Sequence, residues 1–110
     1  MIEIRCRVEG TALVVVLVGD VCLVSAPAIV SCLDAALDTA TQDVIVDLTE
    51  VSVFGATGAR VLSDARRRAA ATGRHLHVRN PSALVAYVLD LCGLGDLVEP
   101  SLFSGAPAAR

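Results

Sequence analysis

The residues best placed for chemistry form a short turn, Gly55-Ala56-Thr57-Gly58, between a buried apolar segment and the start of a helical pattern. A turn in this position brings the free N–H groups of a helix N-terminus to the carboxyl edge of a sheet. Such N–H groups favour an anion, so the turn first suggests a phosphate-binding loop. What it binds depends on the elements around it.

Other polar residues do not form a catalytic set. The sequence has no glycine-rich nucleotide loop, no zinc-protease motif and no nucleophile elbow. Asp20 and Asp47 could meet at the carboxyl edge of a sheet, although acids in such positions are usually turn or cap residues. His75 and His77 alternate along a strand and are typical of solvent-facing side chains. We therefore expect neither an enzyme nor a cofactor.

The four cysteines are Cys6, Cys22, Cys32 and Cys92, and no two of them form a CxxC pair. With only two histidines to join them, they do not match the spacing of a zinc site. We expect no metal and four reduced, buried thiols. A redox switch between two of them stays open, but the spacing does not select the pair.

Composition limits the class of protein. The chain has 110 residues, the size of one domain, and 55% are hydrophobic but only 3% aromatic, so we expect an aliphatic core. A net charge of −3 gives no basic footprint for nucleic acid. The longest apolar run, Ala12–Val18, is too short to span a membrane, and the N-terminus does not resemble a signal peptide. We expect a cytoplasmic protein.

The first half of the chain predicts a hairpin, a helix and a central strand. An alternating strand over Ile2–Val8 and a buried strand over Thr11–Val18 are joined by a short turn. Val21–Val24 is expected to be a loop that packs its apolar side chains inward. Ser25 is a predicted N-cap for a helix ending near Ala40. The expected inner face of that helix carries Ile29, Leu33, Ala36 and Leu37.

The next strand, Val44–Leu48, is apolar on both faces, so we place it centrally and parallel to the second strand. Glu50–Phe54 is a link to the glycine turn. A second helix is predicted from about Thr57 to Ala71. Its inner face would carry Gly58, Val61, Leu62, Ala65 and Ala69, and its outer face would carry pairs at i,i+4, namely Arg60–Asp64 and Asp64–Arg68.

The last elements are a half-exposed strand at Leu76–Val78 and a third helix. Asn80-Pro81 predicts the start of that helix, with Asn80 as N-cap, and Gly93 fits the left-handed position at its end. Leu97-Val98 is expected to be a short strand or an extended piece. The expected buried stripe of the third helix is Leu84, Val85, Val88, Leu91 and Cys92.

The predicted order is β-β-α-β-α-β-α in a single α/β domain over residues 1–100, followed by a C-terminal tail over residues 101–110. We expect a small mixed sheet of about four or five strands with helices packed mainly on one face.

The segment Asp47–Leu62 resembles the signature of STAS domains, and more narrowly that of bacterial anti-sigma factor antagonists, whose pattern is D-L-S-x-V-x-F-x-D-S-S-G-L-G-x-L-L. Val16–Asp20 resembles the family strand that ends in glycine and an acid. Asn80-Pro81 and Leu91–Leu94 resemble the segments flanking the family's third helix. The resemblance covers roughly residues 3 to 100 and implies the STAS fold.

The resemblance implies a partner-switching protein. In this family the unphosphorylated antagonist binds an anti-sigma factor, a serine kinase of the ATPase type, and so releases a sigma factor for transcription in signalling and stress responses. Phosphorylation of a serine at the start of the second helix blocks the complex, because phosphate adds about −1.5 to −2 charge at the docking surface. The implied partner-binding residues here are Asp20, Val21, Cys22, Leu23, Gly55, Ala56, Thr57, Gly58 and Arg60. Isolated domains of this family often pack as dimers in crystals, which leaves a homodimer open, but the sequence does not give the oligomeric state.

The sequence departs from the family at the switch itself. Ala56 occupies the position of the acceptor serine, and Gly55 that of the neighbouring aspartate. Thr57 is the nearest hydroxyl, with an N-cap or first-turn role as one interpretation and a displaced phosphorylation site as the other; Ser52 is a weaker candidate. Binding can therefore persist without the usual switch. The alternative is a STAS signalling module that scaffolds another partner or binds a small apolar ligand.

Overall fold

The computed structural model describes residues 2–39 and 43–99. The order of its helices and strands confirms the predicted order β-β-α-β-α-β-α. The elements are β1 (Ile2–Glu9), β2 (Ala12–Asp20), α1 (Ala26–Thr39), β3 (Asp43–Val53), α2 (Gly55–Ala71), β4 (Leu76–Arg79), α3 (Ala83–Leu91) and the short 3-10 helix η1 (Gly95–Leu97). The predicted helix end at Ala40 and the tail over residues 101–110 lie outside the described residues.

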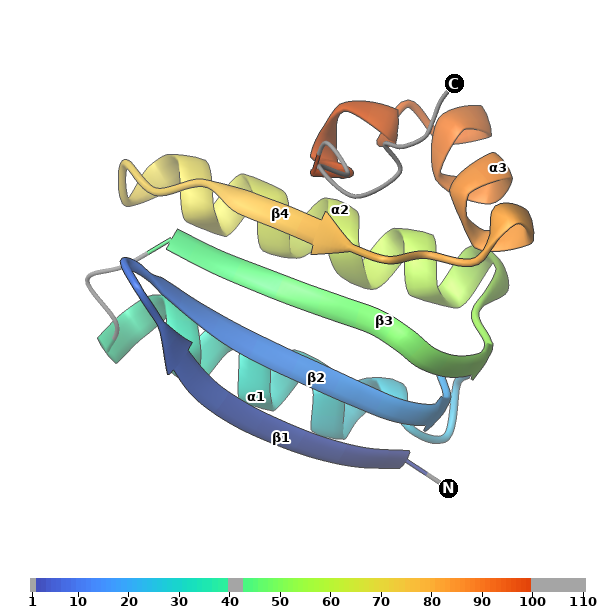
Figure 1. The fold of residues 1–110 in the computed structure, drawn as a ribbon, viewed down its shortest axis with the longest axis horizontal. Coiled ribbons are helices and arrows are strands. Elements are labelled where there is room, and N and C mark those ends of the chain that lie inside the picture. The colour runs from blue at the N-terminus through green and yellow to red at the C-terminus, as the bar shows by residue number, and fades with distance from the viewer. Residues whose placement is uncertain (1, 40–42, 100–110) are drawn as a thin grey trace.

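The sheet has four strands in the order β1-β2-β3-β4. β1 pairs antiparallel with β2, whereas β2–β3 and β3–β4 are parallel, so the predicted mixed sheet is confirmed. The helices α1 and α2 cover one face of the sheet, and α3 and η1 lie beyond β4 (Figure 1). The predicted strand at Leu97-Val98 is wrong in extent, because Leu97 belongs to η1 and only Val98 bridges to Val78.

The main core lies between the sheet and the helices α1 and α2. Val15, Val44 and Val46 point into it from the strands and are fully buried. Every residue predicted for the inner faces of the two helices is buried, namely Ile29, Leu33, Ala36 and Leu37 on α1 and Gly58, Val61, Leu62, Ala65 and Ala69 on α2. Each large aliphatic side chain buried here contributes roughly 1.5–3 kcal/mol, so this layer holds both helices in place.

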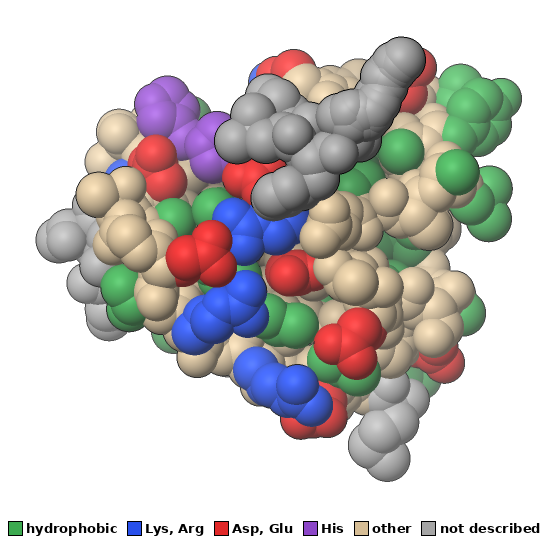
Figure 2. All heavy atoms as spheres, viewed as in Figure 1, with side chains coloured by type: hydrophobic (Ala, Val, Ile, Leu, Met, Phe, Trp, Pro, Cys, Tyr) green, Lys and Arg blue, Asp and Glu red, His purple; other side chains and the backbone are tan. Residues whose placement is uncertain are grey.

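The opposite face of the sheet, which we call the open face, carries a network of ion pairs. Arg79 on the edge strand β4 reaches Glu9 on the other edge strand β1, with 2.9 Å between nitrogen and oxygen, and also pairs with Glu99 at 2.5 Å. Basic and acidic side chains gather over the strands on this face (Figure 2). Val14 and Ile45, which face this side from the middle strands, are still buried. The network therefore bridges an apolar strip on the face of the sheet opposite α1 and α2 (Figure 1).

The third helix differs from its prediction in both its start and its buried face. Its N-cap is Ser82, whose hydroxyl accepts from the Val85 N–H at 3.2 Å, while Asn80 has φ +52° and donates its amide to the Thr49 hydroxyl. Asn80-Pro81 is thus the approach to the helix. The buried residues are Val85 and Leu89, whereas Leu84, Leu91 and Cys92 of the predicted stripe are exposed.

The charged pairs predicted along α2 form with other partners. Asp64 pairs with Arg67 instead of Arg60 or Arg68, and Arg68 pairs with Asp34 on α1 at 3.2 Å. The carboxylate of Asp34 belongs to the neighbouring helix, so a prediction of ion pairs within α2 alone could not include it. The outer face of α2 is therefore tied to α1.

Candidate docking surface

The loop after β2 and the turn after β3 leave the sheet at the same edge. Asp20 at the end of β2 is in register with Val53 at the end of β3, and the Val21 N–H donates to the Val53 carbonyl at 2.7 Å. Because β2 and β3 run parallel, their C-terminal ends deliver both segments to one place. The loop with Asp20, Val21, Cys22 and Leu23 and the turn Gly55–Gly58 therefore lie beside one another.

Ser25 holds the loop in a tight turn. Its buried hydroxyl accepts from the Cys22 N–H at 3.0 Å and donates to the Asp20 carbonyl at 2.7 Å. Ser25 stands directly before α1, as predicted for an N-cap, and its carbonyl accepts from the Ile29 N–H at 3.2 Å, but its hydroxyl bonds back into the loop instead of capping the helix. The chain reverses at Cys22, whose carbonyl accepts from the N–H groups of both Ser25 and Ala26.

The reversal leaves two large apolar side chains at the tip of the loop. Leu23 is 81% exposed and Val24 is 90% exposed, while Val21 is buried. The predicted inward packing of this loop is therefore correct for Val21 and wrong for Leu23 and Val24. Exposed apolar side chains on a loop that is held by internal hydrogen bonds are typical of a surface that docks another protein.

The thiol of Cys22 lies at the start of α1 and accepts hydrogen bonds from the loop. The Ser25 N–H makes the largest contribution, followed by the Ser25 hydroxyl and the Val24 N–H, and together they lower the pKa of Cys22 from its usual value. These donors stabilise the thiolate because they point at the sulfur from a helix N-terminus.

The helix α2 begins at Gly55, two residues earlier than predicted, because β3 continues to Val53 where a link was expected. Gly55 has φ +58°, which a glycine adopts without strain. Gly58 packs on the Phe54 ring so closely that a Cβ at this position would lie 2.5 Å from it. The turn is therefore shaped by glycine at both ends, and Ala56 is exposed between them.

Thr57 is the third residue of α2 and does not cap the helix. The N-cap is Phe54, which has no side-chain cap, so the predicted N-cap role of Thr57 is wrong. Within residues 2–39 and 43–99, no hydrogen bond to the Thr57 hydroxyl is formed. The first turn of α2 therefore has N–H groups without side-chain partners.

A cleft of about 370 Å³ lies between the N-terminal ends of α1 and α2. Four of the residues singled out from the sequence line it, namely Leu23, Ala56, Thr57 and Arg60. Ala26, Val30, Val61 and Asp64 complete the lining. A groove of about 400 Å³ continues from this cleft between the two helices. The groove and the cleft share Val30, Val61 and Asp64.

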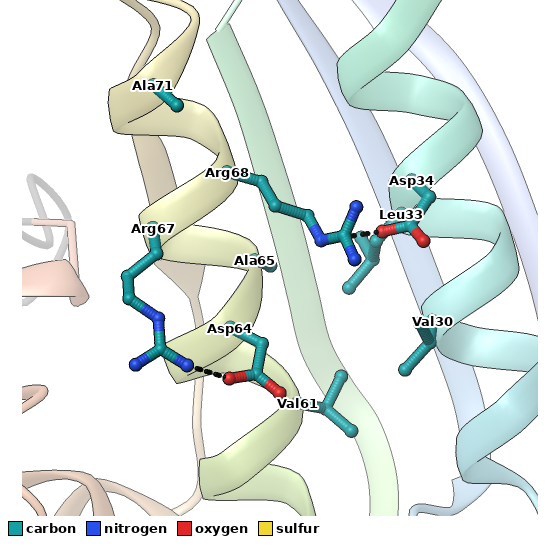
Figure 3. Close-up of a pocket in the computed structure, with 9 residues that line it drawn as sticks. All are labelled: Val30, Leu33, Asp34, Val61, Asp64, Ala65, Arg67, Arg68 and Ala71. Atoms are coloured by element: carbon teal, nitrogen blue, oxygen red, sulfur yellow. Dashed lines mark hydrogen bonds and ion pairs between the residues drawn. The ribbon is translucent and has the colours of Figure 1, made fainter.

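That groove has an apolar floor and a charged rim. Val30 and Leu33 on α1 face Val61 and Ala65 on α2 (Figure 3). The rim carries the ion pairs Arg68–Asp34 and Arg67–Asp64. Sequence reasoning missed the exposure of Val24 at the loop tip and the contribution of Val30 and Val61 to the groove. Val24 could have been found from its apolar type inside a loop, whereas the floor depends on how the two helices pack together.

Asp47, the other acid singled out from the sequence, lies away from the docking loop. Asp20 and Asp47 do not meet, since Asp47 is in register with Val16 and Asp20 with Val53, roughly 20 Å further along β3. Asp47 is a turn residue that accepts from the Thr49 N–H at 2.9 Å and its hydroxyl at 2.6 Å. Among the described residues no cluster of three potential metal ligands occurs, and no helix is long and apolar enough to cross a membrane.

The cysteines are free, and none of the four is fully buried, contrary to expectation. Cys6 on the edge strand β1 and Cys92 at the end of α3 are exposed, while Cys22 and Cys32 are partly buried. Cys6 and Cys92 lie at the margin of the fold, although the hydrophobicity of cysteine alone predicts that they are in the core.

Comparisons with known proteins agree with this fold. Three similar solved structures are the unphosphorylated anti-sigma factor antagonist SpoIIAA (TM-score 0.77, covering 96% of this chain and 92% of that one), the phosphorylated Bacillus cell fate determinant SpoIIAA (0.72, 96% and 96%) and an anti-sigma factor antagonist from Mycobacterium paratuberculosis (0.76, 93% and 88%), each 19% identical. No curated protein matches the sequence. The family model of the STAS domain matches residues 3–106, and the chain belongs to the STAS domain family.

Proposed function

We propose that this chain acts as an anti-sigma factor antagonist, binding an ATPase-type anti-sigma factor in the cytoplasm and so influencing sigma-factor-dependent transcription. The STAS fold and the similarity in fold to antagonists of known structure support a partner-switching role. The proposed docking surface comprises Asp20, Val21, Cys22, Leu23, Gly55, Ala56, Thr57, Gly58 and Arg60. It binds protein and has no catalytic role.

One observation carries this proposal, the cleft at the N-terminal ends of α1 and α2. Leu23 lines the cleft as an apolar anchor, and Val24 is exposed beside Leu23 at the tip of the loop. Arg60 on α2 is an exposed cation with no ion-pair partner among the described residues. Apolar anchors beside a free arginine are the residue types that contribute most to protein interfaces. A partner that fits this surface presents an apolar socket and a carboxylate.

The same surface is proposed to lack the usual serine switch. The side chain of Ala56 is exposed in the first turn of α2 but has no hydroxyl to accept a phosphoryl group. Thr57 is the only other candidate in the turn, as a displaced acceptor. With no phosphate at this position, the docking surface keeps its charge, and the complex is controlled by expression level or by another modification.

A binding measurement with one charged substitution tests the docking surface. Leu23→Asp places a carboxylate on the exposed loop tip, and we expect it to weaken binding to the ATPase-type anti-sigma factor by tenfold or more, a loss of about 1.4 kcal/mol. Leu84→Asp is the matched control, since Leu84 is 72% exposed on α3. Equal affinity of the Leu23→Asp variant and the wild-type chain would overturn the proposed surface.

A second candidate function, scaffolding of another partner or of a second copy, is favoured by α3. Leu84, Tyr87 and Leu91 form an exposed apolar stripe at helical spacing, from 61% to 72% exposed. This stripe lies outside the docking cleft. If scaffolding is the function, Leu84→Asp rather than Leu23→Asp disrupts the complexes that the chain forms.

A further inference from the structure

Two thiols from different elements lie on the helix-covered face of the sheet. Ile2 and Ile4 of β1 pack against the main core, and the two-residue period of a strand directs Cys6 to the same side. Cys6 is also in register with Val15, which is buried in that core. Cys32 on α1 packs against the same core from above. Strand and helix therefore bring these two cysteines to one layer.

The Cys6 sulfur is a neighbour of the Cys32 sulfur in this layer. Burial, the neighbouring Cys6 sulfur and a hydrogen bond between the two thiols raise the pKa of Cys32 to about 11. Cys32 is partly buried, whereas Cys6 is exposed on the edge strand. The pair thus has one sulfur that a solution oxidant can reach and a second sulfur held beside it.

We propose that Cys6 and Cys32 are a modification site at which a hydroperoxide forms a reversible intramolecular disulfide. The Cys6 sulfur attacks the peroxide oxygen, the O–O bond breaks, and Cys6 becomes a sulfenic acid as the hydroperoxide leaves as an alcohol or water. The Cys32 sulfur then attacks the sulfenic sulfur and expels water, which carries away the Cys32 proton. Two thiols lose two electrons in total, and the hydroperoxide gains them.

The disulfide would join the edge strand to α1, which begins directly after the docking loop. The S–S bond is about 2.05 Å long, so the neighbouring thiols need to approach by side-chain rotation. Neither cysteine lines the cleft between α1 and α2. The proposal does not rest on the proposed function, and it gives the chain a covalent response to oxidant in a fold whose serine acceptor is replaced by Ala56.

The test uses the full chain with Cys22→Ser and Cys92→Ser, which leaves only the two proposed thiols. After treatment with hydrogen peroxide and alkylation of remaining thiols, we expect a monomer that has lost two hydrogen atoms and takes up no alkyl group. Dithiothreitol should restore both alkylation sites. The matched control adds Cys32→Ser to the same background, and it should give an oxygen adduct or an intermolecular dimer instead.

The wild-type chain gives a second readout that needs no substitution. Cleavage after Leu23 and Leu33 separates Cys22 from Cys32, and the oxidised chain should yield a peptide with Cys6 linked to Cys32. Oxygen adducts on Cys6 without that linked peptide, or a linkage of Cys6 to another cysteine, would overturn the proposal. So would a two-cysteine variant that keeps both thiols alkylatable after peroxide treatment.

Discussion

At Ala56 an exposed methyl group stands in the first turn of α2, at the position that we propose corresponds to the acceptor serine of the antagonists. The position could be identified from the sequence because Gly55 and Gly58 bracket it. The outward placement of the loop side chains could not be predicted from the sequence. The position of Leu23 depends on the buried hydroxyl of Ser25 and its hydrogen bonds to Cys22. Such a bond network leaves no periodic signal in the sequence.

Restoring the hydroxyl at position 56 tests the missing switch. With an ATPase-type anti-sigma kinase and ATP, the Ala56→Ser variant should be phosphorylated on the new side chain, because that side chain is exposed at the start of α2. The wild-type chain should stay unmodified under the same conditions. Mass spectrometry of the peptides reads out both, with Thr57→Ala as the control. Phosphate on Thr57 of the wild-type chain would contradict a lost switch and would identify a displaced acceptor.

Among the elements, α2 was predictable and α3 was not. In the sequence of α2 the apolar residues of the inner face alternate with charged residues, so the 3.6-residue period of the helix is clear. Seven of the nine residues of α3, Ala83–Leu91, are apolar Ala, Leu or Val, and only Tyr87 and Asp90 interrupt them. Such a helix has no polar side to set its orientation. Packing against α2 and η1 then decides which residues are buried, and that contact is long-range.

Two leucines of α3 test the observed face. Leu89 is fully buried and Leu91 is 67% exposed, although the sequence pattern favoured burial of Leu91. Leu89→Ala should lower the free energy of unfolding by about 2–5 kcal/mol, because it opens a cavity in the core. Leu91→Ala should change it by no more than about 0.5 kcal/mol. Urea titrations measure both, and the reverse ranking would contradict the orientation of α3.

Across the whole molecule, the helix-covered face and the open face are held by different forces. Apolar burial holds α1 and α2 to the sheet, whereas Arg79, Glu9 and Glu99 bridge the open face by ion pairs. The alternating residues of β1 predicted a polar face. The pairing of Glu9 with Arg79 could not be predicted, since the two residues are 70 positions apart in the chain and meet only after the four strands assemble.

This network predicts a loss of stability in acid. Hydrogen bonds from Arg79 and then Arg7 lower the pKa of Glu9 below its usual value of 4.5. A lowered folded-state pKa gives stability that is present above the unfolded value and is lost as the pH falls through the folded one. The melting temperature of the wild-type chain should therefore fall as the pH drops below 4.5, and the fall should be smaller for Glu9→Gln. Identical acid profiles for the two proteins would contradict a contribution of Glu9.

The most direct test of the account places a fixed negative charge at the proposed docking position. Ala56→Glu should weaken binding to an ATPase-type anti-sigma factor roughly tenfold or more by calorimetric titration, because the charge occupies the surface that the partner must cover. Ala70→Glu is the matched control at an exposed position near the other end of α2, and it should bind as the wild-type chain does. Wild-type affinity in the Ala56→Glu variant would contradict docking at the start of α2.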